Sequence, residues 1–394
     1  MMITVYLIFF TAFFILFYNY IGYGMLLYGL IKMKRLFRPE KGPAAPFEPP
    51  VSLVIAAYNE AGFIEQKIIN TLQLDYPSEK LEIIFVTDGS TDETPAIIAR
   101  HPSVTLLHQP QRHGKTAAIN RAMKQVQHPV VIFCDANTLL NPGAVKHIVK
   151  HYADEHTGGV AGEKKVIAGG VAGAAATEGI YWKYESFLKK MDAELYSVVG
   201  AAGELFSIRT ALYAPVEEEV ILDDFIISLR INMAGYRIAY APDAYAMETP
   251  SSSMEEEHKR KVRISAGGFQ SIVMLRPLLN IFRYPLLSFQ YISHRVLRWT
   301  LSPLSLPLLL ISNIILVWAG AGLLYQVVLA GQLCFYLAAL TGYQQAKAHR
   351  KSKLFYIPFY FLFMNIAVYQ GFFRYIAKKQ SAAWDKAQRS TQTL

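Results

Sequence analysis

The chain has 394 residues, of which 53% are hydrophobic and 18% charged, and its net charge is +9. This apolar content excludes a disordered chain, because disordered segments lack the apolar surface that offsets the entropy cost of folding. The two cysteines, Cys134 and Cys334, lie far apart inside apolar runs, which excludes a disulfide framework and a cysteine zinc site.

The N-terminal segment, residues 3–31, is apolar and contains no charged residue. Because about 20 such residues span a bilayer, we expect a transmembrane helix over residues 1–31. A secretory signal fits poorly, since no basic residue precedes the run and no small-residue cleavage site follows it. Residues 32–50 are basic and then proline-rich, which predicts a cytoplasmic flank and a stiff linker.

Residues 51–280 have the pattern of a globular α/β domain. Four short β-branched runs alternate with helical stretches, at residues 51–57, 81–87, 104–108 and 130–134. Such alternation is typical of a mostly parallel sheet. The pair Asn141–Pro142 predicts a helix start, with the asparagine as the cap.

The last part of the chain is apolar again. We expect an interfacial helix over residues 281–300 and a transmembrane region over residues 301–376 with two or three spans. Two spans would return the chain to the cytoplasmic side, where the basic residues near 347–353 belong. If residues 354–376 also span the membrane, the basic tail, 377–394, lies on the outer side, against the positive-inside rule. If residues 354–376 lie in the membrane interface, the tail stays on the cytoplasmic side.

Much of the positive charge flanks these apolar runs. A membrane surface explains this placement better than nucleic acid does, and the sequence contains no nucleic-acid-binding motif. We therefore expect a lipid bilayer as partner and no nucleic acid.

Polar residues follow three of the predicted strands. Tyr58 and Glu60 follow the first, Asp88 ends the second, and Asp135 and Asn137 follow the fourth. Since the carboxyl ends of parallel strands meet at one edge of a sheet, we expect these residues to lie close together. Oxygen ligands from Asp135 and Asn137 suit Mg²⁺ or Mn²⁺, and a divalent cation neutralises a nucleotide diphosphate.

These segments resemble the family 2 glycosyltransferases, which have a GT-A fold. The resemblance covers about residues 51–270 and keeps the family's order, through VSLVIAAYNE, VTDGSTDET, RHGKTAAIN, FCDANTLL, GAAGELFSIR and LDDFIISLRI. The membrane flanks resemble those of polysaccharide-making members. The resemblance implies an α/β GT-A domain with a mixed, mostly parallel sheet, between N- and C-terminal transmembrane helices.

The resemblance also implies a nucleotide-sugar site. Ala57, Tyr58 and Glu60 would line the nucleobase pocket. Asp88 would bind the uracil or the ribose, and Lys115 would lie near the nucleotide.

Two departures from the family pattern affect the diphosphate side of that site. Asp135 would ligate the metal, but Asn137 stands where relatives usually have a second aspartate, so either metal affinity is lower or Asp135 acts alone. Arg260 and Arg263, one helical turn apart, can face the same diphosphate. Processive members have a tryptophan after this second arginine, and here Ile264 replaces it, which leaves processive and single transfer both open.

The acceptor side is implied by two later segments. Gly203 and Glu204 belong to the acceptor stretch, and Asp224 would be the general base that deprotonates the acceptor hydroxyl. Attack on the face opposite the leaving diphosphate inverts the anomeric centre. The neighbouring Asp223 carboxylate is expected to raise one pKa of the pair, which favours a base.

The sequence thus predicts a membrane-bound inverting glycosyltransferase, with its catalytic domain on the cytoplasmic side of the inner membrane. The expected donor is a UDP-sugar bound with Mg²⁺ or Mn²⁺, and the acceptor is a polysaccharide or a lipid-linked saccharide. Two alternatives stay open. A polyprenyl-phosphate sugar synthase would not need Asp224, because its acceptor phosphate is already ionised; a non-catalytic nucleotide-sugar-binding membrane subunit would be consistent with Asn137.

Overall fold

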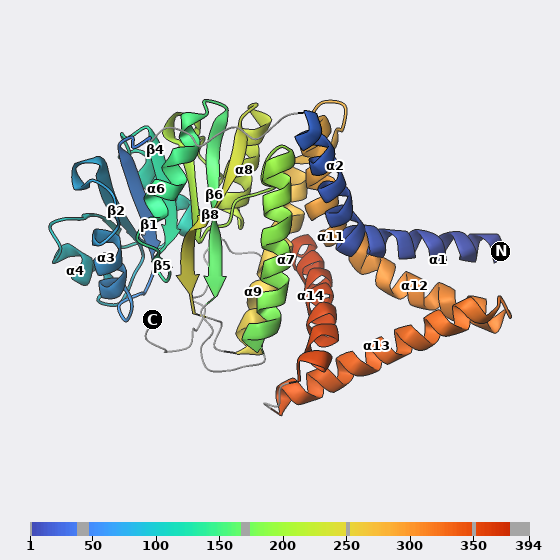
Figure 1. The fold of residues 1–394 in the computed structure, drawn as a ribbon. Coiled ribbons are helices and arrows are strands. Elements are labelled where there is room, and N and C mark those ends of the chain that lie inside the picture. Colours follow the sequence, from blue (N-terminus) through green and yellow to red (C-terminus); the bar gives the residue numbers. More distant parts are fainter. Residues whose placement is uncertain (1, 38–46, 167–173, 250–252, 349–351, 379–394) are drawn as a thin grey trace.

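The computed structural model describes residues 2–37, 47–166, 174–249, 253–348 and 352–378. Residues 38–46 of the expected linker and the basic tail beyond residue 378 lie outside these ranges. Figure 1 shows a sheet domain at one end of the molecule, upright helices beside it, and long helices that extend away on the other side.

The domain is built on one eight-stranded sheet with the order β3-β2-β1-β4-β7-β6-β8-β5. Strands β1 to β4 pair in parallel, whereas β7 runs antiparallel to both β4 and β6. The predicted mixed, mostly parallel sheet is confirmed. The strands are β1 Val51–Ala57, β2 Leu81–Asp88, β3 Thr105–Gln109, β4 Val130–Asp135, β5 Leu139–Leu140, β6 Thr157–Val166, β7 Leu205–Arg209 and β8 Arg237–Glu248.

Both faces of the sheet are covered by helices, which explains the continuous apolar runs in its sequence. On β1, Val54 packs into one core, while Leu53 and Ile55 pack into the other. The first core also contains side chains of α5 and α8, and the second contains side chains of α3, α4 and α6. These helices are α3 Ile64–Leu72, α4 Thr94–Ala99, α5 Lys115–Met123, α6 Ala144–Val149 and α8 Asp223–Met233.

The predicted cap at Asn141 is wrong. Helix α6 begins at Ala144, after Gly143. The Asn141 side chain instead accepts from the Tyr245 backbone N–H at 2.7 Å and donates to the Asp243 carbonyl at 3.1 Å. It joins the end of β5 to β8, because an asparagine amide can satisfy backbone groups of a neighbouring strand as well as those of a helix.

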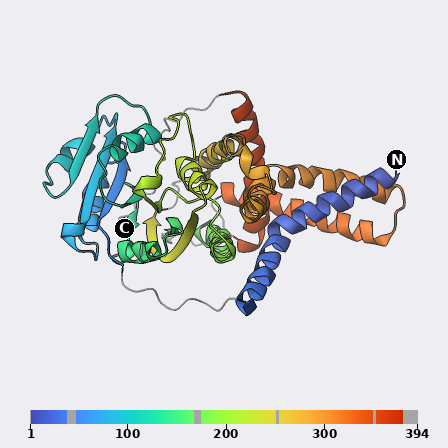
Figure 2. The ribbon, with the colours of Figure 1, turned by 90° about the horizontal axis from the view of Figure 1, so that it is seen from above.

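Within the described residues, four helical stretches are long and apolar enough to cross a membrane, at residues 2–37, 301–318, 323–347 and 354–376. The first consists of α1 Met2–Phe17 and α2 Tyr23–Phe37, which meet at an angle across a π-helical turn. Helices α1, α12 Leu301–Trp318 and α13 Leu323–Lys347 extend to the same side (Figures 1 and 2). Helix α14 Lys353–Ile376 lies across that direction, beside α9 Met254–Met274.

Helices α14 and α9 touch through their backbones. A Cβ atom at Gly371 would lie 2.8 Å from the Ala266 nitrogen and 2.9 Å from the Val262 carbonyl oxygen. Only glycine permits this approach, because any side chain would have to displace main-chain atoms. The two helices are therefore fixed at a close main-chain contact.

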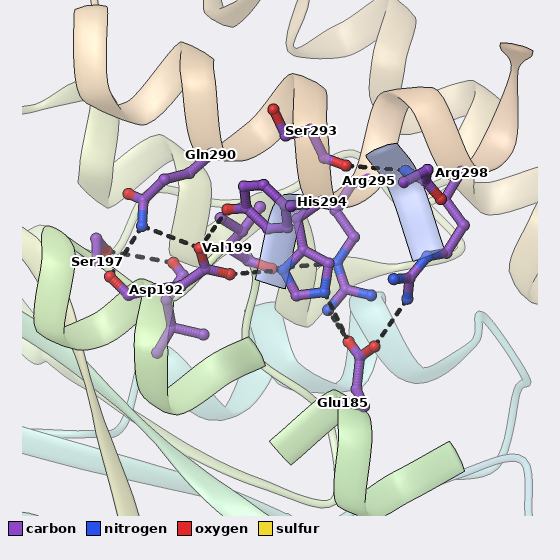
Figure 3. Close-up of polar contacts among 12 residues, drawn as sticks. Glu185, Asp192, Ser197, Val199, Gln290, Ser293, His294, Arg295 and Arg298 are labelled. Atoms are coloured by element: carbon purple, nitrogen blue, oxygen red, sulfur yellow. Dashed lines mark hydrogen bonds and ion pairs between the residues drawn. The ribbon is translucent and has the colours of Figure 1, made fainter. Parts of the chain in front are cut away.

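A continuous helical segment from Pro285 to Trp299 stands where one interfacial helix was expected; it comprises α10 Pro285–Tyr291, a π turn and α11 Leu297–Trp299. Buried polar contacts join it to α7 Ala174–Leu195 and to α2 (Figure 3). Asp192 accepts from His294 Nδ1 at 2.6 Å, from Gln290 Nε2 at 3.0 Å and from the Tyr23 hydroxyl at 2.5 Å.

The second carboxylate of this network is Glu185. It contacts Arg295 at 2.7 Å, Arg298 at 2.9 Å and His294 Nε2 at 3.2 Å, and its side chain is 3% exposed. Burial alone would raise the pKa of Glu185, but Arg295 and His294 outweigh it and hold the pKa well below its usual range. Glu185 is thus a buried anion that depends on its cationic partners.

We predict that Glu185→Ala lowers the free energy of unfolding by about 3–5 kcal/mol, because it leaves buried cations without their anion. The matched control is Asp75→Ala, which removes an exposed ion pair with Lys146 at 2.7 Å and should cost about 0–1 kcal/mol. Denaturant unfolding of the detergent-solubilised chain, followed by tryptophan fluorescence, measures both. Equal effects of the two substitutions would contradict the prediction.

Candidate active site

A pocket lies at the carboxyl ends of β1, β2 and β4. The predicted nucleotide and metal residues of these strands and of α5 all line it, namely Ala57, Tyr58, Glu60, Asp88, Lys115, Asp135 and Asn137. The parallel topology causes this convergence, since β1 is hydrogen-bonded to both β2 and β4.

Asp88 holds the loop that closes the pocket. Its carboxylate accepts from the backbone N–H groups of His113 at 2.7 Å and Gly114 at 2.6 Å. The loop also presses on Gly89, where a Cβ atom would lie 2.4 Å from the Cβ of Arg112 and where φ is +67°. Asp88 therefore shapes the pocket through this loop as well as lining it.

Arg112 is a pocket residue that the sequence analysis missed. Its guanidinium lies 3.9 Å from the centre of the Tyr58 ring, an arrangement that is favourable between a cation and an aromatic face. The signal was present, because Arg112 opens the RHGKTAAIN segment that contains Lys115.

Lys115 and Asp135 form an ion pair at the floor of the pocket, with 2.6 Å between Nζ and Oδ1. Burial acts to lower the pKa of Lys115, but the carboxylates of Asp135, Asp223 and Asp224 raise it above its usual range. Burial raises the pKa of Asp135, and Lys115 opposes that shift. Lys115 therefore stays charged and fixes the Asp135 carboxylate.

A second, larger cavity of about 760 Å³ begins at the same two residues, Lys115 and Asp135. It extends past α8 and α9 to α7, to the Pro285–Trp299 segment and to α14. The pocket and the cavity therefore meet at one ion pair. Its lining includes the remaining predicted site residues, Gly203, Glu204, Asp223, Asp224, Arg260 and Arg263.

Asp223 and Asp224 form the first turn of α8 and face this cavity. Burial, and then the charge of Asp223, raise the pKa of Asp224 to about 7, while Lys115 opposes the shift. The Oδ2 atom of Asp223 is buried and has no hydrogen-bond partner among the described residues. At neutral pH, Asp224 can therefore gain or lose a proton, as a general base must.

Gly203 and Glu204 lie beside this acidic turn. A Cβ atom at Gly203 would lie 3.0 Å from the Lys115 Nζ and 3.4 Å from Asp224 Oδ2. Glu204 pairs at 2.7 Å with Lys164, whose side chain is 1% exposed and which also contacts Glu248. Burial acts to raise the pKa of Glu204, but Lys164 holds it well below its usual range. Glu204 is thus a fixed anion in the cavity wall.

Arg260 and Arg263 reach the cavity from α9. Arg260 forms an ion pair with Glu257, at 3.1 Å from Nε to Oε2. Ile264 also lines the cavity, at the position where processive relatives have tryptophan. A tryptophan from another segment, Trp299, lines the same cavity. Its ring packs edge to face against the Phe225 ring, with 5.6 Å between the ring centres.

The structure adds cavity residues that lie far from the motifs in the sequence. They come from α7, from the Pro285–Trp299 segment and from α14, and they include Trp182, Arg295, Arg298, Trp299 and Arg374. The available signal was the mixture of arginines, leucines and aromatic residues over 283–299, a pattern that also predicts an interfacial helix.

Residues 52–215 match the model of a family described as Glycosyl transferase family 2. The poly-beta-1,6-N-acetyl-D-glucosamine synthase of Staphylococcus aureus (strain MSSA476) is 26% identical over 250 residues, and that of Staphylococcus epidermidis 24% over 249 residues. Each match covers 60% of this chain and only 59% and 58% of the respective relative.

A solved structure shows the same fold over almost the whole chain. This is the mannosyltransferase PcManGT from Pyrobaculum calidifontis in complex with GDP-Man and Mn²⁺, which is 23% identical with a TM-score of 0.71. The alignment covers 95% of this chain and 100% of that one. The expected GT-A fold is confirmed.

We predict that Asp224 titrates near neutral pH. Infrared difference spectra should contain a protonated-carboxyl band that disappears as the pH rises through about 7, because the charged form of Asp224 is disfavoured by burial and by Asp223. The band should be absent in Asp224→Asn and unchanged in the exposed control Asp75→Asn. If it persists in Asp224→Asn, another carboxyl group is responsible.

Proposed function

Residues 52–215 form a glycosyl transferase family 2 domain, and on this basis we propose that the chain is a membrane-bound inverting glycosyltransferase. The donor is a nucleotide sugar, expected to be a UDP-sugar, and the acceptor is a polysaccharide or a lipid-linked saccharide. The catalytic domain would face the cytoplasm at the inner membrane, with the apolar helices as its anchor.

One observation supports this function best, namely the junction of the pocket and the cavity at Lys115 and Asp135. A transferase needs a donor site and an acceptor site that meet where the bond is exchanged. The smaller pocket suits a nucleotide, and the larger cavity, with Asp224 in its wall, suits the acceptor.

On the donor side, the Tyr58 ring and the Arg112 guanidinium would form one wall for the base, with Ala57 and Glu60 beside them. Asp88 would act largely through the loop whose amides it binds. Arg260 could bind the donor diphosphate from the cavity side, since it lines the cavity, whereas Arg263, one turn further along α9, is assigned to the acceptor.

The residues present fit a divalent cation. Asp135 and Asn137 offer the hard oxygen ligands that Mg²⁺ and Mn²⁺ prefer, and such ions usually take their other ligands from phosphate and water. Among the described ranges there is no cluster of three or more His, Cys, Asp or Glu that could hold a metal, which agrees with a site completed by the donor. The related PcManGT fold was solved with Mn²⁺. When bound, the cation would neutralise charge on the leaving diphosphate.

Asp224 would act as the general base. The acceptor hydroxyl would give its proton to Asp224 while its oxygen attacks the anomeric carbon and the bond to the diphosphate breaks on the opposite face. Lys115 would hold Asp135 and add positive charge near the leaving group. Asp223 would keep the pKa of Asp224 close to neutral.

The first test is nucleotide release by membranes containing the chain, measured across a panel of UDP- and GDP-sugars with Mn²⁺ or Mg²⁺. We expect release from at least one donor, loss of release with EDTA, and a fall of about 100-fold or more in Asp135→Ala, because the diphosphate loses its cation. Asp75→Ala should match the native chain. Release from none of the donors would favour a non-catalytic binding subunit, and undiminished release in Asp135→Ala would disprove the metal assignment.

The second test is Asp224→Asn, which keeps the size of the side chain but removes the base. The rate should fall by about 10²–10⁴-fold, and the native rate should rise with pH to a plateau above about 7, as Asp224 becomes charged. Kinetics with a saturating donor measure both. Near-native turnover of Asp224→Asn would instead favour the polyprenyl-phosphate sugar synthase, whose acceptor needs no base.

A further inference from the structure

Helix α14 forms a wall between the cavity and the apolar outer surface. Its inner side packs on α9, through Gly371 and through a hydrogen bond between His258 and Gln370 at 2.5 Å. Its other side exposes large apolar side chains, including Leu354, Ile366 and Phe373, which are 73%, 50% and 66% exposed. A helix with one face on protein and an exposed apolar face is typical of a membrane interface.

The part of the cavity that α14 lines is largely apolar. Six of its residues are Ile357, Tyr360, Phe361, Met364, Asn365 and Val368. A hydrophilic saccharide chain would gain little from such a wall, whereas a hydrocarbon chain would bury apolar surface against it. This end of the cavity therefore suits a lipid tail.

Arginines line the same cavity as the acidic turn of α8 and this apolar wall. Arg295 and Arg298 are balanced by Glu185, as described above. Arg374, from the last turn of α14, has no carboxylate among the described residues within 4.0 Å. One cavity-facing cation of α14 thus lacks an anion within the described protein.

A second arginine, Arg263 of α9, lines the same cavity as Arg374. Burial lowers the pKa of Arg263, and the positive charge of Arg374 adds to that shift, while Asp223, Asp135 and Asp224 oppose it. Arg263 therefore feels both the acidic turn and Arg374. Two neighbouring guanidinium groups repel each other, and a phosphate that accepts hydrogen bonds from both would remove the repulsion.

We propose that the acceptor is a saccharide linked through phosphate or diphosphate to a lipid, with its phosphate at Arg263 and Arg374 and its hydrocarbon chain along α14. This inference rests on the proposed function and narrows its acceptor. The acceptor hydroxyl would lie at Asp224, so that the donor site, base, phosphate site and apolar wall follow one another along the cavity. Arrival from the bilayer would confine the acceptor to the interface and raise its effective concentration.

The test measures binding by the full chain in nanodiscs of neutral phosphatidylcholine, in EDTA so that cation-dependent diphosphate binding at the donor site is absent. The probes are farnesyl diphosphate, farnesol and inorganic pyrophosphate. We expect farnesyl diphosphate to bind at least 10-fold more tightly than either of the others, because only it has both the anion and the chain. Equal binding of pyrophosphate or of farnesol would overturn the proposal.

The variant Arg374→Gln should weaken farnesyl diphosphate binding at least 10-fold. The matched control is Lys378→Gln, which removes an exposed charge just beyond the same helix end and should change binding less than two-fold. If Arg374→Gln does not fold, Arg374→Lys replaces it, and its binding should fall between the two. Native binding by either Arg374 variant, or an equal loss in Lys378→Gln, would overturn the proposal.

The glycosyltransferase activity and the lipid-linked acceptor can be disproved separately. Nucleotide release with Mn²⁺ by membranes containing the chain, where an endogenous acceptor or water takes the sugar, tests the glycosyltransferase alone. If the donor is cleaved but farnesyl diphosphate does not bind, only the lipid-linked acceptor is wrong; if no donor is cleaved, the proposed function fails first.

Discussion

The buried carboxylates Glu185 and Asp192 are the contacts on which the rest of the structure depends. They lie two turns apart on α7, and between them they bind His294, Arg295 and Arg298 of the interfacial segment. Asp192 also accepts from Tyr23 of α2. A buried ion network of this kind fixes geometry strongly. Its charged groups have lost their hydration, and only one arrangement of partner groups compensates that loss.

This network also determines what lines the large cavity. Arg295 and Arg298 keep their place in its wall because Glu185 compensates their charge. Without that anion, their guanidinium groups would be drawn toward the acidic turn of α8 or toward solvent. Charges thus join α7 to α2 and to the Pro285–Trp299 segment, and α7 and this segment line the cavity together.

The first strands and the donor pocket could be predicted because the signals are local. A parallel strand that is covered on both faces appears in the sequence as an unbroken apolar run. The turn residues that follow this run lie at the carboxyl end of the strand, where the pocket forms. Asn141 shows the limit of local signals. The same asparagine amide can cap a helix or bind the backbone of a neighbouring strand. Asn141 binds the strand because the Tyr245 backbone N–H lies within hydrogen-bond distance.

The larger cavity could not be predicted in the same way. Trp182, Trp299 and Arg374 lie 75 to 192 positions apart in the chain, and only helix packing places them in one wall. The role of Asp88 was likewise incomplete, because its hydrogen bonds to His113 and Gly114 depend on the path of a loop. The types of side chain in the sequence indicate which chemistry is available. Tertiary contacts determine where in the structure these side chains lie.

The main-chain contact at Gly371 has a consequence for how such a protein can diversify. The spacing between α14 and α9 is fixed by backbone atoms, so it does not change when other side chains on these helices are replaced. Descendants could accordingly exchange the residues that face inward, and adapt to differently shaped molecules, while the gap between the two helices keeps its width.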